Sequence, residues 1–154
     1  MTLQRILLAA AAGLAMAASP AGYDHWTAKQ LSDYDKALPG KMSAQKIGSQ
    51  VLGKYGNHLV QLVHREGSGE AELHETQADV MFIRAGEASL VVGGSMRGSK
   101  TTAPNEQRGP KIEGGEKQAL HAGDIVHIPS KTPHQMLLDS GKTVDYAIVK
   151  VDTP

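Results

Sequence analysis

The sequence contains no cysteine, no excess of either charge sign and no apolar run long enough to span a bilayer. Without cysteine, neither a disulfide framework nor a metal site built from thiolates can form, and a lipoprotein anchor is excluded. The 16 basic and 16 acidic side chains give a formal net charge of zero with neutral histidines. A nucleic-acid binder needs a basic surface that displaces counterions from phosphate, so we expect no nucleic-acid partner.

The longest apolar run lies at the N-terminus. Arg5 precedes a run from Ile6 to Ala18, which contains the small-x-small cleavage pattern Ala15-Met16-Ala17. The run is shorter than the roughly twenty residues that cross a bilayer. A buried N-terminal helix is the alternative, but the run is apolar on all sides. We therefore interpret residues 1–17 as a secretory signal peptide, which predicts a periplasmic or secreted protein with no membrane association after cleavage.

The chain after the signal peptide has the composition of one compact domain rich in turns, with 40% apolar residues and 17 glycines. Thr27 and Gln30 have the spacing of a capping box, and Pro39-Gly40 is a helix stop. Residues 18–57 are therefore expected to hold a short helix and a lead-in strand.

From Ser49 onward the apolar pattern changes to the period of two that is typical of β-strands. The predicted strands cover residues 50–54, 58–65, 72–75, 80–84, 87–92, 118–121, 125–128, 134–138 and 144–151. Residues 95–117 show no credible periodicity and are predicted to form a long loop. One helix followed by many short strands favours an all-β sandwich or barrel, with its main domain at 58–154.

Four side chains are candidate ligands for one divalent metal ion. Glu72 and His74 are two residues apart, so they leave the same face of an extended strand. Asp79 follows after a short turn, and His134 follows a proline-containing turn later in the chain. Two carboxylates in a low-dielectric interior repel each other unless a proton or a cation is present. We therefore favour metal binding over a metal-free barrel in which these residues are only polar decoration.

The spacing of these residues resembles the cupin superfamily, whose members are small jelly-roll barrels that typically hold a metal. The family's first motif runs glycine, His-x-His, three or four residues, glutamate, six residues, glycine. Here it reads Gly69, Glu72-x-His74, four residues, Asp79, six residues and Gly86. Glu72 thus replaces the family's first histidine, and Asp79 replaces its glutamate.

The second cupin motif runs glycine, five residues and then Pro-x-Gly-x-x-His. This chain gives Gly123, five residues and then Pro129-x-Lys131-x-x-His134. Four spaced features agree, while Lys131 stands at the position of a glycine. The resemblance covers roughly residues 58 to 150.

The resemblance implies a cupin-type jelly-roll β-barrel with a short N-terminal helix. It implies Glu72, His74, Asp79 and His134 as ligands of a divalent metal ion, with Mn or Fe favoured over Ni, Co and Zn. If Asp79 is too short to reach, the other three form a triad of two histidines and one carboxylate. Asp79 is then free to act as a general base, and Lys131 could meet a substrate. Asp79 and Lys131 are therefore the catalytic candidates.

Cupins include dioxygenases, isomerases, lyases, decarboxylases and binding or storage proteins, so the fold does not determine the chemistry. The leading hypothesis is an exported metal-dependent enzyme of isomerase, lyase or dioxygenase type that acts on a small polar molecule. The alternatives are a non-catalytic module that binds a small ligand or metal, and a vestigial barrel without metal that serves only in oligomerisation. A homodimer is left open.

Two bound carboxylates would leave the metal centre formally neutral, so attraction of an anion would fall to nearby basic groups. Segment 95–117 is rich in such groups: Arg97, Lys100, Arg108, Lys111 and Lys117. It is therefore expected to be a lid or partner-contacting flap that selects a polar or anionic ligand, or else a solvated insertion without consequence.

Overall fold

The computed structural model describes residues 20–154, so the predicted signal peptide at 1–17 lies outside the described part. Twelve strands follow a short helix within this range. The elements are α1 Ala28–Ala37, the 3-10 turn η1 Leu38–Lys41, β1 Ile47–Lys54, β2 His58–Arg65, β3 Ala71–His74, β4 Gln77–Val92, β5 Ser95–Arg97, β6 Lys100–Ala103, β7 Glu106–Gly109, β8 Lys111–Glu113, β9 Glu116–His121, β10 Ile125–Ile128, β11 His134–Leu137 and β12 Val144–Asp152. The predicted all-β class is confirmed.

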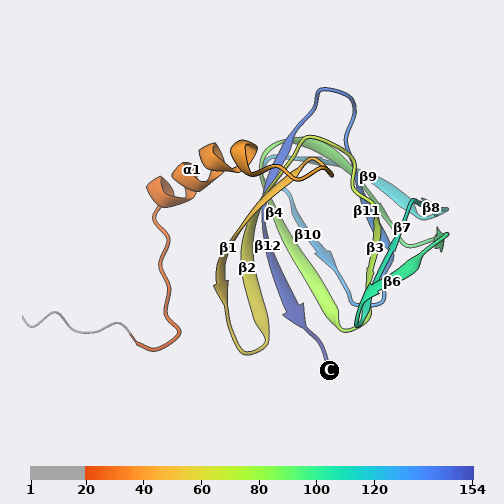
Figure 1. Cartoon of the computed structure of the whole chain (residues 1–154), viewed down its shortest axis with the longest axis horizontal. Helices are drawn as coiled ribbons and strands as arrows, with labels where there is room; N and C mark the ends of the chain where they lie inside the picture. Colours follow the sequence, from red (N-terminus) through yellow and green to blue (C-terminus); the bar gives the residue numbers. More distant parts are fainter. Residues whose placement is uncertain (1–19) are drawn as a thin grey trace, which may run out of the picture.

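The long strand β4 connects the two halves of the barrel. Its first half pairs with β12 and β10, and its second half pairs with β11 and β9, all antiparallel. The main path of the sheet runs β1-β2-β12-β4-β11-β3-β7-β6, so it curls over on itself around an interior (Figure 1). We call the half with β1, β2, β12 and β10 the first sheet, and the half with β9, β11, β3, β7 and β6 the second sheet.

Gly86 lets β4 pass from one sheet to the other without a break. The sequence predicted two strands separated at this glycine, whereas the structure has one strand that bends there. Gly86 has a φ of 74°, and a Cβ at this position would lie 2.0 Å from the carbonyl oxygen of Thr143. Only glycine fits such a backbone conformation and such a close approach.

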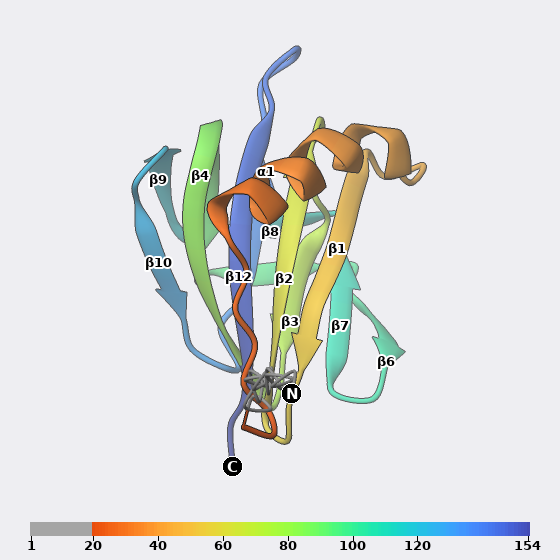
Figure 2. The same cartoon turned by 90° about the vertical axis from the view of Figure 1, so that its left-hand side faces the viewer.

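Helix α1 lies across the outer face of the first sheet (Figure 2). The predicted capping box is present, since Thr27 and Gln30 satisfy each other's backbone donors. An ion pair of 2.6 Å between Arg84 of β4 and Asp35 fixes the helix to the sheet. Within residues 20–154, no helix is long and apolar enough to cross a membrane.

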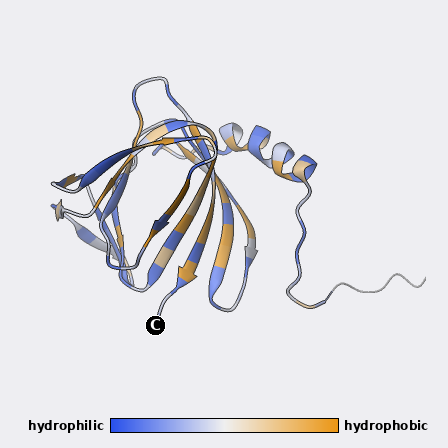
Figure 3. Ribbon diagram, turned by 180° about the vertical axis from the view of Figure 1, so that it is seen from behind, coloured by the Kyte–Doolittle hydropathy of each residue, from blue (hydrophilic) through white to orange (hydrophobic). Residues whose placement is uncertain are grey.

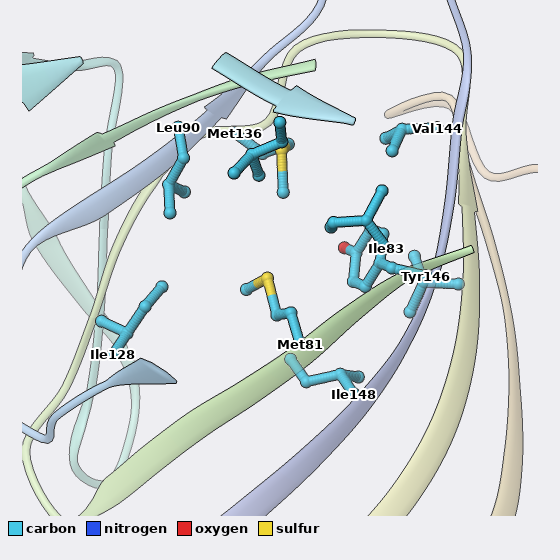
Figure 4. Packing of buried hydrophobic residues seen from close by; sticks show 10 residues of the cluster. Met81, Ile83, Leu90, Ile128, Met136, Val144, Tyr146 and Ile148 are labelled. Carbon is cyan, nitrogen blue, oxygen red and sulfur yellow. The ribbon is translucent and has the colours of Figure 1, made fainter. Parts of the chain in front are cut away.

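The core lies between the two sheets. The strands carry alternating apolar and polar bands, so one set of side chains faces the interior (Figure 3). The buried cluster consists of Val63, Met81, Ile83, Leu90, Leu120, Ile128, Met136, Val144, Tyr146 and Ile148, most of them labelled in Figure 4. This packing holds the two sheets together and leaves the polar residues of β3, β7 and β11 along the remaining interior surface.

The segment 95–117 differs from its prediction as a loop without secondary structure. Strands β6 and β7 extend the second sheet beyond β3, while β5 and β8 form a separate two-stranded ribbon. These strands are only three or four residues long, and most of their residues are exposed. A period-two pattern of apolar residues does not arise in strands that bury so little surface, so the sequence did not reveal them.

A partly buried ion pair between β2 and β12 is expected to make the stability depend on pH. His64 lies opposite Asp145, with Nδ1 2.6 Å from its Oδ1 and Nε2 3.2 Å from Glu66 Oε1. Burial lowers the pKa of His64, but the two carboxylates outweigh it, so the net pKa is raised. Because the pKa of His64 is higher in the folded than in the unfolded state, its protonation stabilises the protein. This stabilisation is complete below the unfolded-state pKa of about 6.5 and is lost as the pH rises through the folded-state pKa.

We therefore expect Asp145→Asn to lower the free energy of unfolding by about 1 kcal/mol at pH 5. The loss should be smaller at about pH 8.5. Urea unfolding of the wild type and the variant at both pH values measures this difference. An equal loss at both values would mean that the pair contributes through a neutral hydrogen bond rather than through charge.

Candidate metal centre

The strand register brings the predicted ligands of the second sheet together. His134 of β11 lies directly opposite Glu72 of β3, and Glu72 lies opposite Arg108 of β7. His74 lies opposite Glu106 of β7. Because residues two apart share a face, Glu72, His74, Glu106 and Arg108 all point to the same side as His134.

The first sheet contributes one carboxylate and one amine from the other side of the interior. Asp79 of β4 lies opposite Lys150 of β12. The Lys150 Nζ donates to both oxygens of Asp79, at 2.8 and 3.0 Å. Asp79 is the most deeply buried of the predicted ligands, with 1% of its surface exposed.

The four predicted ligands converge on one point. Glu72 Oε2 lies 3.6 Å from His74 Nε2 and 3.8 Å from His134 Nε2. Asp79 Oδ2 lies 3.4 Å and 3.6 Å from the same two nitrogens. Ligand atoms of Glu72, His74 and His134 all lie within 4.8 Å of one another. These separations are of the size expected between atoms that share one metal ion.

Both histidines direct Nε2 toward this point because Nδ1 is held from behind. His74 Nδ1 is 2.7 Å from Glu106 Oε1, and His134 Nδ1 is 3.0 Å from the carbonyl oxygen of Thr132. An acceptor at Nδ1 favours the proton there and leaves the Nε2 lone pair for a ligand, as in many metal sites. His134 Nε2 is buried and has no hydrogen-bond partner. The residues therefore fit a divalent metal ion.

The two carboxylates already have cationic partners, which the sequence argument did not include. Arg108 Nη1 contacts Glu72 Oε2, and Arg65 Nη2 lies 3.5 Å from Glu72 Oε1. Burial raises the pKa of Glu72, but Arg108, His134 and Arg65 outweigh it and the net pKa is lowered. Burial likewise raises the pKa of Asp79, and the contacts with His74 and Lys150 lower it overall. Carboxylate repulsion therefore does not by itself require a metal ion here.

Lys150 is placed where it would compete with a metal ion. Its Nζ lies 3.0 Å from His74 Nε2 as well as in contact with Asp79. The ammonium thus donates to the same lone pair that a metal ion would use. Because 20% of the Lys150 side chain is exposed, the amine has a route toward solvent when another cation takes its place.

A cavity of about 190 Å³ adjoins these side chains. Its polar wall includes Arg65, Glu72, Asp79, Arg108, His134 and Lys150. Its apolar wall includes Val63, Met81, Leu90, Met136 and Ile148. A small ligand in this space would touch the candidate metal centre on one side and the apolar core on the other.

The structure places Lys131 away from the other predicted site residues. Its side chain is exposed, and it does not line the cavity, whereas its backbone N–H donates to the carbonyl oxygen of His74 at 2.7 Å. Lys131 also has a φ of 62°, the conformation for which the cupin motif has glycine. Its backbone therefore supports the metal centre, and a catalytic role of its amine stays a prediction.

We expect Lys131→Gly to stabilise the protein by about 0.5–1 kcal/mol. Glycine removes the strain of the left-handed conformation, and this gain exceeds the extra backbone entropy that glycine loses on folding. Thermal unfolding of the variant, with Lys100→Gly in exposed β6 as a destabilising control, measures this effect. A loss of ligand affinity or turnover in a stabilised variant would instead support a functional role for the Lys131 amine.

Sequence reasoning missed Lys150, Arg65 and Glu106, and it named Arg108 only as one of five basic residues in segment 95–117. Strand alternation contained the signal for Lys150, since it shares a face with the buried residues Val144, Tyr146 and Ile148. Arg65 follows the same rule after Val63. Glu106 and Arg108 come from the segment that was predicted to be a loop, so their direction had no sequence signal.

Comparisons with known proteins agree with this arrangement at the level of the fold. No protein-family model and no curated protein matches the sequence. A Thermus thermophilus protein matches with a TM-score of 0.54 and 18% identity over 77% of this chain and 94% of its own. A cupin-2 domain protein from Rhodospirillum rubrum matches with a TM-score of 0.52 and 16% identity over 70% of this chain and 60% of its own.

The polyketide cyclase RemF from Streptomyces resistomycificus matches with a TM-score of 0.50 and 15% identity. The match covers 70% of this chain and 66% of RemF, so the chain spans just under two thirds of that protein. Identities at this level show a shared fold rather than a shared activity. The curled antiparallel barrel and these likenesses together show that the chain has the cupin fold.

Proposed function

We propose that this protein is a metal-dependent cupin enzyme that acts on a small polar molecule. The observation that carries the proposal is the convergence of Glu72 Oε2, His74 Nε2 and His134 Nε2, with the buried His134 Nε2 lacking any partner. A buried polar atom without a partner is costly and rare in native structures. A bound cation would satisfy it.

Glu72, His74 and His134 would hold the metal ion, with Asp79 as a fourth ligand or a neighbouring base. Two imidazoles and one or two carboxylates suit Mn²⁺ or Fe²⁺ first, with Ni, Co and Zn as alternatives. The metal ion would supply Lewis acidity at a carbonyl or hydroxyl group, or activation of oxygen. Asp79, ionised and hydrogen-bonded to Lys150, could exchange a proton with a ligand in the cavity, and Lys150 could donate one.

A second candidate function is a metal-free module that binds a small ligand. The contact of Lys150 with both His74 Nε2 and Asp79 favours it, because the ammonium takes the place of a cation. The basic groups Arg65, Arg108 and Lys150 then balance the carboxylates around the site without any ion. Those carboxylates are Glu72, Asp79 and Glu106. Isomerase, lyase and dioxygenase chemistry would all be absent from such a module.

Water relaxation in the presence of Mn²⁺ separates these functions. The enzyme proposal expects the protein to bind one Mn²⁺ ion that retains at least one exchangeable water molecule, which strongly enhances proton relaxation. A bound Mn²⁺ without exchangeable water would indicate a closed binding or storage site. No binding of Mn²⁺, Fe²⁺ or Zn²⁺ would support the metal-free module.

We also propose that residues 1–17 direct export and are then removed, which places the mature protein in the periplasm or outside the cell. N-terminal sequencing of protein from a secretion-competent bacterial host is expected to return a start near Ala18. A sequence that begins at Met1 would contradict export by this route. A homodimer is a further proposal, which sedimentation of the mature chain would test.

A further inference from the structure

The groups around the candidate metal centre balance only while no metal ion is bound. Three basic side chains face three carboxylates: Arg65, Arg108 and Lys150 against Glu72, Asp79 and Glu106. With neutral histidines the three positive and three negative charges sum to zero. A divalent ion that displaces the Lys150 ammonium would therefore leave one positive charge in excess in a cavity that is partly shielded from water.

Both arginines are directed at the same carboxylate that the metal ion would use. Arg65 and Arg108 each contact Glu72 from a different sheet. The Arg108 Nη1 atom is buried against Glu72. Once a metal ion takes the Glu72 oxygen, the two guanidinium groups lose part of their counter-charge. Guanidinium groups pair best with carboxylates and phosphates, to which they can donate two parallel hydrogen bonds.

The rest of the cavity indicates that an anion bound by the two arginines would have an apolar part. Side chains of Val63, Met81, Leu90, Met136 and Ile148 line the same cavity as the arginines. The volume of about 190 Å³ admits only a small molecule. A free inorganic ion would leave this apolar surface in contact with water, whereas a short hydrocarbon chain would cover it.

We propose that the metal-loaded cavity binds a small organic carboxylate through Arg65 and Arg108, and that the metal ion and the carboxylate each strengthen the binding of the other. The inference rests on the proposed metal centre and names its ligand class. Because coupling between two ligands is reciprocal, it is measurable from the metal side without knowledge of the reaction.

Calorimetric titration of Mn²⁺ into the metal-free mature protein tests the coupling, with excess butyrate, butyramide or inorganic phosphate in separate arms. Butyrate is expected to tighten Mn²⁺ binding by about tenfold or more, and the neutral amide is expected to have no effect. Equal Mn²⁺ affinity in all arms would overturn the inference and leave the metal centre intact. Absence of Mn²⁺ binding in every arm would overturn both, and a larger effect of phosphate than of butyrate would overturn the carboxylate assignment.

Arg108→Gln and Arg97→Gln form a matched pair in this experiment. Arg97 lies in the same segment of the chain, but it is exposed and pairs with Glu113 at 2.7 Å. Arg108→Gln is expected to keep Mn²⁺ binding without butyrate, or to tighten it, because a nearby positive charge is removed. The tenfold effect of butyrate should disappear in Arg108→Gln and persist in Arg97→Gln. If Arg108→Gln instead loses Mn²⁺ binding along with the butyrate effect, Arg108 only supports Glu72. The proposal that Arg108 donates hydrogen bonds to the bound carboxylate would then be wrong.

Discussion

Alanine in place of His134 should weaken the binding of a divalent metal ion by about 100-fold or more. Even the loss of a residue that only supports a metal ligand often lowers metal affinity by about 10–100-fold. The substitution removes the one ligand nitrogen that has no other partner. His74→Ala should have a similar effect, because its Nε2 is the second nitrogen of the centre. Titration of metal-free protein with Mn²⁺ or Zn²⁺ gives the affinities, and thermal unfolding should show that metal no longer stabilises either variant.

His127→Ala is the matched control for these two variants. His127 also lies on a short strand, but its side chain is exposed and away from the cavity. Its removal should leave the metal affinity unchanged. Asp79→Ala then separates the two coordination schemes. A loss as large as that of His134→Ala means four ligands, and a milder loss means that the triad binds metal while Asp79 serves as a base.

Lys150→Met should lower the stability of the metal-free protein and raise its affinity for a divalent metal ion. Without metal, Asp79 loses its ammonium partner at 1% exposure, a change that costs about 3 kcal/mol or more when such a pair is buried. The melting temperature in chelator should therefore fall by about 10 °C. With metal, the competing ammonium is gone, so the affinity for a divalent ion should rise and the ion should restore most of the lost stability.

Lys142→Met provides the comparison, because Lys142 forms its ion pair with Glu87 on the surface. Exposed pairs contribute little, so its melting temperature should change by only a few degrees with or without metal. If Lys150→Met were destabilised equally in chelator and in Mn²⁺, the ammonium would be the permanent cation of the site. The metal-free module would then be the better account.

The strands that enclose the core were predictable because they bury one face. In β12, Val144, Tyr146 and Ile148 alternate with less buried residues, so the pattern predicts the strand and its orientation. Strand β7 buries only Gly109 and forms by pairing with β3, which is a tertiary effect without a local pattern. The path of β4 through Gly86 was likewise hidden, because a glycine with positive φ is typical of both a turn and a bent strand.

The convergence of Glu72, His74, Asp79 and His134 was predictable from motif spacing, and the structure brings all four together. The charge environment was not predictable, because it depends on which residue of one strand lies opposite which residue of another. The pairs Glu72–Arg108 and Asp79–Lys150 follow from register alone. Register also decides which basic groups reach the centre: of the five in segment 95–117, Arg108 contacts a candidate ligand, and Arg65 and Lys150 come from the first sheet.

Crystals of the mature protein soaked in Mn²⁺ would test the central claim most directly. Anomalous diffraction is expected to place one ion about 2.0–2.3 Å from Nε2 of His74, Nε2 of His134 and a carboxylate oxygen of Glu72, with the Lys150 amine moved away. Density for the ammonium between His74 and Asp79, without an anomalous peak at saturating Mn²⁺, would contradict the account.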